Sequence, residues 1–148
     1  MKINVPGYRM LTIKNIILDF NGTITVDGTM KESVKQRIIR LAEQFFIYVI
    51  TSDTQGTAAR ELEGFPITLK IFNNPNSGEY KRQIIEALGG GNCACIGNGH
   101  NDKLMFQAAG LSIAVLETEG LCASILTDAD LLVKSSEDAL DLLLDTKA

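Results

Sequence analysis

The sequence has 148 residues, of which 45% are hydrophobic and 22% charged, as expected for one globular domain with a complete core. Its net charge of −4 and scattered basic residues argue against nucleic-acid binding, which requires a basic surface. No apolar run approaches the roughly 20 residues of a membrane span, and the N-terminus lacks the layout of a signal peptide. We therefore expect a single domain over residues 1–148, located in the cytoplasm, with no nucleic-acid or membrane partner.

Strand and helix patterns alternate along the chain. Residues 1–14 contain a Pro6-Gly7 turn and predict a hairpin or an edge strand. Apolar runs predict strands at 16–19, 46–50, 67–72, 93–96, 111–115 and 131–133. Helical spacing predicts helices at 30–44, after a Thr54 cap, at 79–88, 101–109 and 121–127, and after a Ser135 or Ser136 cap. This alternation specifies a central parallel sheet in a three-layer α/β/α Rossmann-like domain, with functional loops after residues 18, 50, 72 and 96.

The first of these loops begins at Asp19. The buried run 16–18 ends in this carboxylate, and Gly22-Thr23 follows closely. A carboxylate at the end of a strand can act as a nucleophile toward phosphorus or as a ligand of Mg²⁺. Gly22 allows the backbone to approach a phosphate, and the Thr23 hydroxyl can donate a hydrogen bond to it. The same pattern also occurs in plain structural turns.

The other three loops carry residues of matching chemistry. Thr51-Ser52 can hold a phosphate oxygen, with a plain cap as the less favoured alternative for Thr51. Lys81 begins the helix after the third loop and can neutralise phosphate charge, or it can be a solvated helix lysine. The fourth loop, 97–102, combines two glycines with oxygen-bearing side chains that suit a hard cation.

From residue 15 onward the chain resembles the haloacid dehalogenase (HAD)-like phosphohydrolase superfamily. Its four motifs are matched in order by residues 19–23, Thr51, Lys81 and residues 97–102. Within that superfamily the chain is similar to the phosphorylation domain of P-type ATPases, through residues 50–53, Thr57-Ala58 and the run 109–115. No nucleotide-binding domain or membrane helices accompany this segment, so the chain is not a pump by itself.

The resemblance implies a mechanism and a cofactor. Asp19 would attack phosphorus and form a phospho-aspartate, and Thr51 and Lys81 would hold the phosphoryl oxygens. Mg²⁺ would bind Asp19, the main-chain carbonyl of Asn21, and Asn98 and Asp102 in the fourth loop. Gly22, Thr23, Ser52 and His100 complete the predicted phosphate-binding surroundings.

Two residues depart from the superfamily pattern. Asn21 stands where phosphatases carry a second Asp that protonates the leaving group and activates water, so the acid–base share of the rate, about 10²–10⁴-fold, is at risk. P-type ATPases also lack an Asp there, which suggests that Asn21 slows dephosphorylation. Asn98 stands where an Asp ligand is usual and brings no negative charge to the metal. His100, the one histidine, is either a surface residue or a substitute for the missing proton-transfer group.

Neither interval that holds a cap domain in the superfamily has room for one in this chain. An open site suits a macromolecular substrate or closure by a second subunit, so we expect either a phosphorylated small molecule or a protein as substrate, and a homo-oligomer. Cys93 and Cys95 alternate in a strand and should both point to one buried face, with Cys122 remote in sequence, which argues against a zinc or redox site.

The sequence thus predicts a Mg²⁺-dependent phosphohydrolase that acts on a phosphate ester or an acyl phosphate through Asp19. The alternative is a binding or regulatory protein of the same fold that lacks the general acid/base. A nucleotide-binding Rossmann domain is not supported, because no Gly-x-Gly-x-x-Gly turn follows the first strand.

Overall fold

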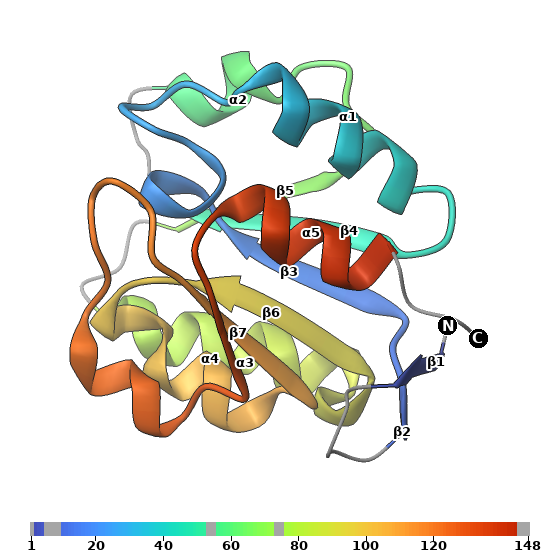
Figure 1. The fold of residues 1–148 in the computed structure, drawn as a ribbon, viewed down its shortest axis with the longest axis vertical. Helices are drawn as coiled ribbons and strands as arrows, with labels where there is room; N and C mark the ends of the chain where they lie inside the picture. The colour runs from blue at the N-terminus through green and yellow to red at the C-terminus, as the bar shows by residue number, and fades with distance from the viewer. Residues whose placement is uncertain (1, 5–9, 53–55, 73–75, 145–148) are drawn as a thin grey trace.

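The computed structural model describes residues 2–4, 10–52, 56–72 and 76–144. Six parallel strands form the central sheet in the order β5-β4-β3-β6-β7-β8 (Figure 1). Their bounds are β3 (Asn15–Asp19), β4 (Phe46–Thr51), β5 (Thr68–Ile71), β6 (Cys93–Gly97), β7 (Leu111–Val115) and β8 (Leu131–Val133). The predicted three-layer α/β/α fold with a central parallel sheet is confirmed.

Helices cover both faces of this sheet (Figure 1). On one face lie α1 (Glu32–Leu41), α2 (Thr57–Glu61) and α5 (Ser136–Leu144), and on the other lie α3 (Ser77–Leu88) and α4 (Lys103–Ala108). Successive strand residues point to opposite faces, so Ile16 and Leu18 of β3 join the first core, whereas Ile17 joins the second. Cys93 and Cys95 are both buried in the second core, as the alternation predicted.

Short helical turns connect several elements. They are η1 (Phe20–Ile24), a π-type turn interrupted by non-helical residues, and the 3₁₀ turns η2 (Gly90–Asn92), η3 (His100–Asp102) and η4 (Ala123–Thr127). Near the N-terminus β1 (Lys2–Asn4) and β2 (Met10–Thr12) pair antiparallel, in the segment expected to be a hairpin or an edge strand.

Helix ends account for most differences from the predicted elements. The helix expected to reach residue 44 ends at Leu41, and the one expected over 101–109 divides into η3 and α4. The segment 121–127 forms the 3₁₀ turn η4 instead of an α-helix. Ser135 Oγ accepts the Asp138 N–H at 3.0 Å, which identifies Ser135 as the cap of α5. The predicted Thr54 cap lies outside the described residues.

No cap domain interrupts the described chain between the strands. Between β3 and β4 it holds η1, a turn closed by a Val26–Thr29 bridge, and α1, while α3 and η2 lie between residue 76 and β6. Among the described residues, no helix is both long and apolar enough to cross a membrane.

Candidate active site

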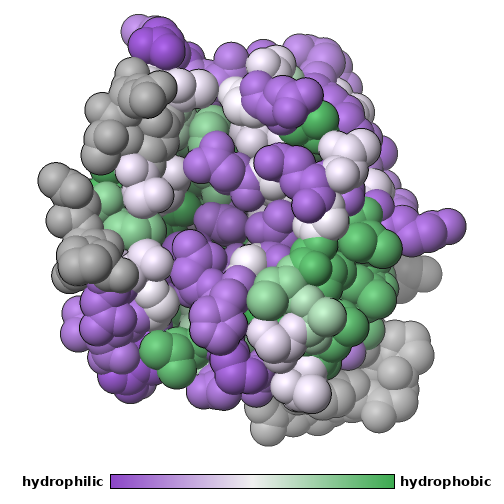
Figure 2. All heavy atoms as spheres, turned by 90° about the vertical axis from the view of Figure 1, so that its left-hand side faces the viewer, coloured by the Kyte–Doolittle hydropathy of each residue, from purple (hydrophilic) through white to green (hydrophobic). Residues whose placement is uncertain are grey.

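The topology brings the predicted site residues to one edge of the sheet. Asp19 is the last residue of β3, which lies between β4 and β6 in the middle of the sheet. It pairs in register with Ile50, so Thr51 at the end of β4 lies beside it, and β6 ends alongside at Gly97. Figure 2 looks onto this edge and shows hydrophilic side chains gathered at its centre, with a hydrophobic patch to one side. From β3 the chain continues to β4 and β5 on one side of the sheet and then to β6 on the other side, so the strand order reverses beside β3. In α/β proteins ligands bind at such a reversal.

Lys81 connects two carboxylates at the centre of the site. Its ammonium group donates to Asp19 Oδ1 at 3.1 Å and to Asp102 Oδ1 at 2.7 Å. The Lys81 and Asp102 side chains are only 1% and 0% exposed, and that of Asp19 is 13% exposed. The second turn of α3 thus delivers a buried positive charge to the end of β3, which excludes the alternative of a solvated helix lysine.

Asp102 has both carboxylate oxygens engaged within the protein. Its Oδ1 accepts from Lys81, and its Oδ2 accepts the backbone N–H groups of Asn98 and Gly99, each at 3.0 Å. A Cβ atom on Gly97 would lie 2.4 Å from Oδ2, so only glycine admits the carboxylate here. The role of Asp102 as a metal ligand stays a prediction, and its contacts favour a role in orienting Lys81 and the fourth loop.

Two side-chain oxygens converge on the Thr23 hydroxyl. Thr23 Oγ1 lies 3.5 Å from Asp19 Oδ2 and 3.3 Å from Asn98 Oδ1. Thr23 is itself fixed, because its carbonyl accepts a hydrogen bond from Ser136 Oγ at the start of α5. The loops after β3 and β6 therefore place one carboxylate and one amide oxygen around a single small space.

Gly22 is required by the path of the loop after β3. Its φ of +72° lies in the left-handed region that side chains disfavour. A Cβ atom at this position would also stand 2.7 Å from Asn98 Nδ2 and 3.0 Å from Glu119 Oε2. The Gly22 carbonyl accepts from Asn98 Nδ2 at 3.1 Å, so the first and fourth loops are joined at this residue.

The remaining predicted residues surround this centre. Thr51 is buried at 2% exposure at the end of β4, whereas Ser52 and Asn21 are exposed. The exposed His100 has Nδ1 3.3 Å from Ser124 Oγ and does not share the Asp19–Lys81–Asp102 contacts. The roles predicted for these residues stay predictions.

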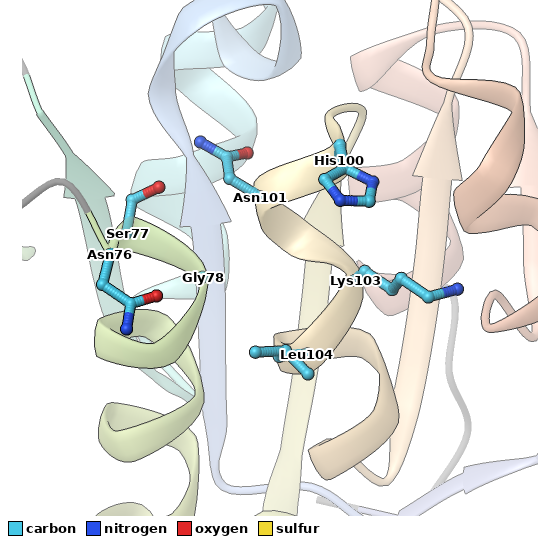
Figure 3. A pocket seen from close by; sticks show the side chains of 7 residues that line it. All are labelled: Asn76, Ser77, Gly78, His100, Asn101, Lys103 and Leu104. Carbon is cyan, nitrogen blue, oxygen red and sulfur yellow. The ribbon is translucent and has the colours of Figure 1, made fainter.

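A cavity of about 380 Å³ lies between the first turn of α3 and the η3–α4 segment. It is lined by Asn76, Ser77, Gly78, His100, Asn101, Lys103 and Leu104. In Figure 3 Leu104 points toward α3, while Lys103 points away from it. Lys103 pairs instead with Asp128, at 2.5 Å, so its charge is already neutralised by a carboxylate outside the cavity lining.

Burial and charge move the pKa of the Asp19 carboxyl group. Burial and then the Asp102 charge raise its pKa from 3.8 to about 7, with Lys81 acting in the opposite direction. For Lys81, burial lowers the pKa, but the charges of Asp19 and Asp102 outweigh this effect and the pKa is raised. The Lys81 ammonium group therefore stays charged. A further cation beside Asp19 would favour the ionised form of its carboxyl group.

The chemistry of the donors fits a hard divalent cation. Asp19 and Asn98 each have a side-chain oxygen within 3.5 Å of the Thr23 hydroxyl, and Mg²⁺ is commonly held by one or two carboxylates together with carbonyl oxygens and water. In the described parts of the chain, no group of three or more His, Cys, Asp or Glu residues is arranged to hold a metal ion. The predicted ligands Asp19, Asn98, Asp102 and the Asn21 carbonyl thus stay candidates.

One part of the site had no signal in the sequence. The turn after β7, residues 117–120, closes with the Gly120 N–H donating to the Glu117 carbonyl at 2.8 Å. Its Gly120 carbonyl accepts from Asn98 Nδ2 at 3.3 Å, and the Glu117 carboxylate accepts from Ser136 N at 2.7 Å. No motif marks this turn, and only the folded arrangement brings it onto the fourth loop.

Sequence comparison identifies two relatives from Methanocaldococcus jannaschii. The uncharacterized protein MJ0072 is 51% identical over 39 residues, which is 26% of this chain and 89% of that protein. The uncharacterized protein MJ0073 is 47% identical over 49 residues, which is 33% of this chain. The match spans about half of MJ0073, 53% of its length. No protein-family model matches the chain.

Solved structures share the whole architecture at low sequence identity. The cobalt-bound 3-deoxy-D-manno-octulosonate 8-phosphate phosphatase of Haemophilus influenzae superposes with a TM-score of 0.74 and 18% identity, covering 90% of this chain and 86% of that one. The 3-deoxy-D-manno-octulosonate 8-phosphate phosphatase of Moraxella catarrhalis, in complex with magnesium, phosphate and KDO, has a TM-score of 0.68 and 17% identity. The match covers 89% of this chain and 86% of that one. A protein from Streptomyces avermitilis that is assigned to the HAD family of hydrolases has a TM-score of 0.70 and 17% identity. The match covers 86% of this chain and 80% of that one.

Proposed function

The chain belongs to the same family as MJ0072 and has the fold of HAD hydrolases, and from this premise we propose that it is a Mg²⁺-dependent phosphohydrolase. The observation that carries the proposal is the buried Lys81 ammonium between Asp19 and Asp102. Burying a lysine with two carboxylates carries a desolvation cost, and clusters of this kind with shifted pKa values gather at functional sites. Their place at the sheet edge supports phosphoryl transfer.

The proposed reaction has two steps. An Asp19 oxygen attacks phosphorus, the bond from phosphorus to the leaving group breaks, and the leaving group departs with the electron pair. Water then attacks the phospho-aspartate, which releases phosphate and restores the carboxylate. Lys81 and the Thr51 hydroxyl hold phosphoryl oxygens, while Asp102 keeps Lys81 and the N–H groups of residues 98 and 99 in place.

The metal would lie between Asp19, Asn98 and the carbonyl of Asn21. When bound, Mg²⁺ would supply positive charge that keeps Asp19 ionised and offsets phosphoryl charge. The Thr23 hydroxyl, within 3.5 Å of both side-chain oxygens, keeps them oriented toward that space.

Asn21 narrows the substrate class. An amide donates no proton to a leaving group, so leaving groups that depart as stable anions are favoured. An acyl phosphate fits this requirement, and a phosphate ester of an acidic alcohol fits it next best. Among the described residues no cap domain lies between the strands, so a phosphorylated protein or a small molecule could enter at the edge seen in Figure 2. Closure by a second subunit would require a homo-oligomer, which sedimentation would test.

The test is hydrolysis of acetyl phosphate and p-nitrophenyl phosphate, with and without Mg²⁺. We expect turnover that requires both Mg²⁺ and Asp19 and is lost in Asp19→Ala. Glu43→Ala is the matched control, because Glu43 is exposed and lies just before β4 at the opposite edge of the sheet. Equal rates in Asp19→Ala and the wild-type protein would contradict the proposal.

The second candidate is a binding or regulatory protein that retains the fold. It is favoured by the Asn98 amide, whose Nδ2 group is used to hold the Gly22 and Gly120 carbonyls. Protection against heat by phosphate plus Mg²⁺, together with no turnover of either compound, would support this candidate. A complex with beryllium fluoride that depends on Asp19 would instead support the phospho-aspartate chemistry.

A further inference from the structure

The turn after β7 brings a carboxylate to the edge of the candidate metal site. A Cβ atom built on Gly22 would lie 3.0 Å from Glu119 Oε2 and 2.7 Å from Asn98 Nδ2. Glu119 and the Asn98 amide therefore approach the same point of the first loop. In the described part of the chain, no hydrogen-bond donor or ion-pair partner is assigned to the Glu119 carboxylate.

The position of this turn is fixed on both sides. On one side Asn98 Nδ2 donates to the Gly120 carbonyl at 3.3 Å, and the Cys122 N–H donates to the Asn98 main-chain carbonyl at 2.8 Å. On the other side the Glu117 carboxylate accepts from Ser136 N at 2.7 Å and from Ser136 Oγ at 3.1 Å. Glu119 lies between these two anchors, so its backbone is held over the fourth loop.

The surroundings of residue 98 favour an amide over a carboxylate. Asn98 Nδ2 donates to the carbonyls of Gly22, at 3.1 Å, and Gly120, at 3.3 Å. An Asp at this position would direct a second oxygen at these two carbonyls and toward Glu119, and all these contacts would be repulsive. A negative charge at residue 98 is thus disfavoured by the same turn that carries Glu119.

Resting on the proposed function, we propose that Glu119 supplies the negative charge that Asn98 does not bring to the Mg²⁺ site. It acts as a positioning carboxylate beyond Asn98, through Coulomb attraction or through a metal-bound water, and the pair Asn98–Glu119 replaces a single acidic ligand. The negative charge thus comes from the turn after β7 instead of the fourth loop, while the Asn98 side-chain oxygen keeps its contact with the Thr23 hydroxyl.

The test measures Mg²⁺ binding to the full chain by titration calorimetry at low ionic strength. We expect Glu119→Gln to weaken Mg²⁺ affinity about threefold to tenfold, and the loss to shrink as salt is raised, since charges near solvent are screened. Glu43→Gln removes an exposed carboxylate at the opposite sheet edge and should leave the affinity unchanged. Asp19→Asn identifies the portion of the heat that belongs to this site.

A second pair of variants returns the charge to residue 98. Asn98→Asp alone should bind Mg²⁺ no better than wild type, because Glu119 and the two carbonyls oppose the new charge. Asn98→Asp combined with Glu119→Gln should bind more tightly than Glu119→Gln alone. Glu119 is exposed, so Glu119→Gln should keep the wild-type circular dichroism spectrum.

The outcomes separate this inference from the proposed function. Mg²⁺ binding that is lost in Asp19→Asn but unchanged in Glu119→Gln overturns the role of Glu119 and leaves the phosphohydrolase proposal intact. Wild-type protein without Asp19-dependent Mg²⁺ binding overturns both. Weakening by Glu119→Gln that equals the effect of Glu43→Gln also overturns the inference, because it reports only the overall charge.

Discussion

The Lys81 ammonium group lies 2.7 Å from Asp102 Oδ1, closer than the 3.1 Å that separates it from Asp19 Oδ1. Asp102 is the more deeply buried of the two carboxylates and uses its other oxygen on backbone N–H groups. Asp102 and Lys81 therefore form a fixed pair, while the second Asp19 oxygen has only a long contact of 3.5 Å, with the Thr23 hydroxyl. In the proposed reaction this asymmetry fits Asp102 as the supporting carboxylate and Asp19 as the nucleophile.

Lys81→Met should destabilise the protein because it leaves two carboxylates without their buried cation. We expect a loss of about 3 kcal/mol in the free energy of unfolding at pH 8, the size seen when one partner of a buried pair is removed. The loss should be smaller at pH 5, where Asp19 can take up a proton. Urea denaturation at both pH values measures this difference.

Lys103→Met is the control for Lys81→Met. Lys103 pairs with Asp128 near the surface, with a side chain that is 33% exposed, and surface pairs contribute at most about 1 kcal/mol. A Lys81→Met variant that is no less stable than Lys103→Met would mean that the two carboxylates do not depend on the buried ammonium.

Asp19→Asn should change the pH dependence of stability in the metal-free protein. Burial raises the Asp19 pKa from 3.8 to about 7 in the folded state, so between these values only the folded state holds the proton. In the wild-type protein, the stabilisation that protonated Asp19 contributes is fully present below about pH 4 and is lost as the pH rises through 7. Asp19→Asn carries no ionisable group here, so its melting temperature should exceed that of wild type at pH 8 and match it near pH 4.

Thermal unfolding in the presence of a chelator, from pH 4 to 8, provides the measurement. Asp138→Asn is a suitable control, because Asp138 is exposed and its side chain lies outside the site. A pH-independent difference between Asp19→Asn and wild type would show that Asp19 does not titrate in this window.

The sheet edge could be predicted from the sequence because the central strands β3, β4 and β6 are apolar runs that end in distinctive residues. Asp19, Thr51 and Gly97 stand at the ends of buried runs, and parallel strands bring such ends together. The burial of Lys81 could not be predicted, since helical spacing alone left it equally suited to solvent. Only the packing of α3 against η3 and α4, which places Lys81 between Asp19 and Asp102, decides this.

The turn carrying Glu119 shows a second limit of sequence analysis. Residues 117–120 have an ordinary turn composition, and their bonds to Asn98 and Ser136 join segments that are distant in the chain. Asp102 was expected from its motif to bind metal, yet a motif does not say which oxygens are already occupied. Three-dimensional hydrogen bonding supplies that information.

Mg²⁺ affinity should rise with pH and level off near pH 7. The folded, metal-free Asp19 holds its proton below about pH 7, and a metal ligand must lose its proton, so metal and proton compete. Affinity should increase about tenfold for each pH unit between roughly 5 and 7. Calorimetric titration in buffers of different ionisation heat measures both the affinity and the proton released. Affinity that is constant from pH 5 to 8 would contradict the competition.

Asn21→Asp should accelerate turnover by restoring a carboxyl group that can exchange a proton with the leaving group and water. General acid–base catalysis contributes about 10²–10⁴-fold, and a position on the exposed side of the first loop leaves room for the substitution. Asn21 has a negative φ of −70°, so Asp fits the same backbone without strain. Steady-state hydrolysis of p-nitrophenyl phosphate compares the two proteins.

The substrate dependence of this gain distinguishes its cause. Acetyl phosphate has a leaving group that needs little protonation, so Asn21→Asp should speed its first step less than that of a phosphate ester of a simple alcohol. If breakdown of the phospho-aspartate limits the wild-type rate, a burst of product equal to the enzyme concentration should precede slow turnover, and Asn21→Asp should remove the burst. Asn21→Ala, which changes the same side chain without adding an acid, should retain the wild-type burst and rate. Acceleration by Asn21→Ala as large as that by Asn21→Asp would assign the effect to loop freedom instead of proton transfer.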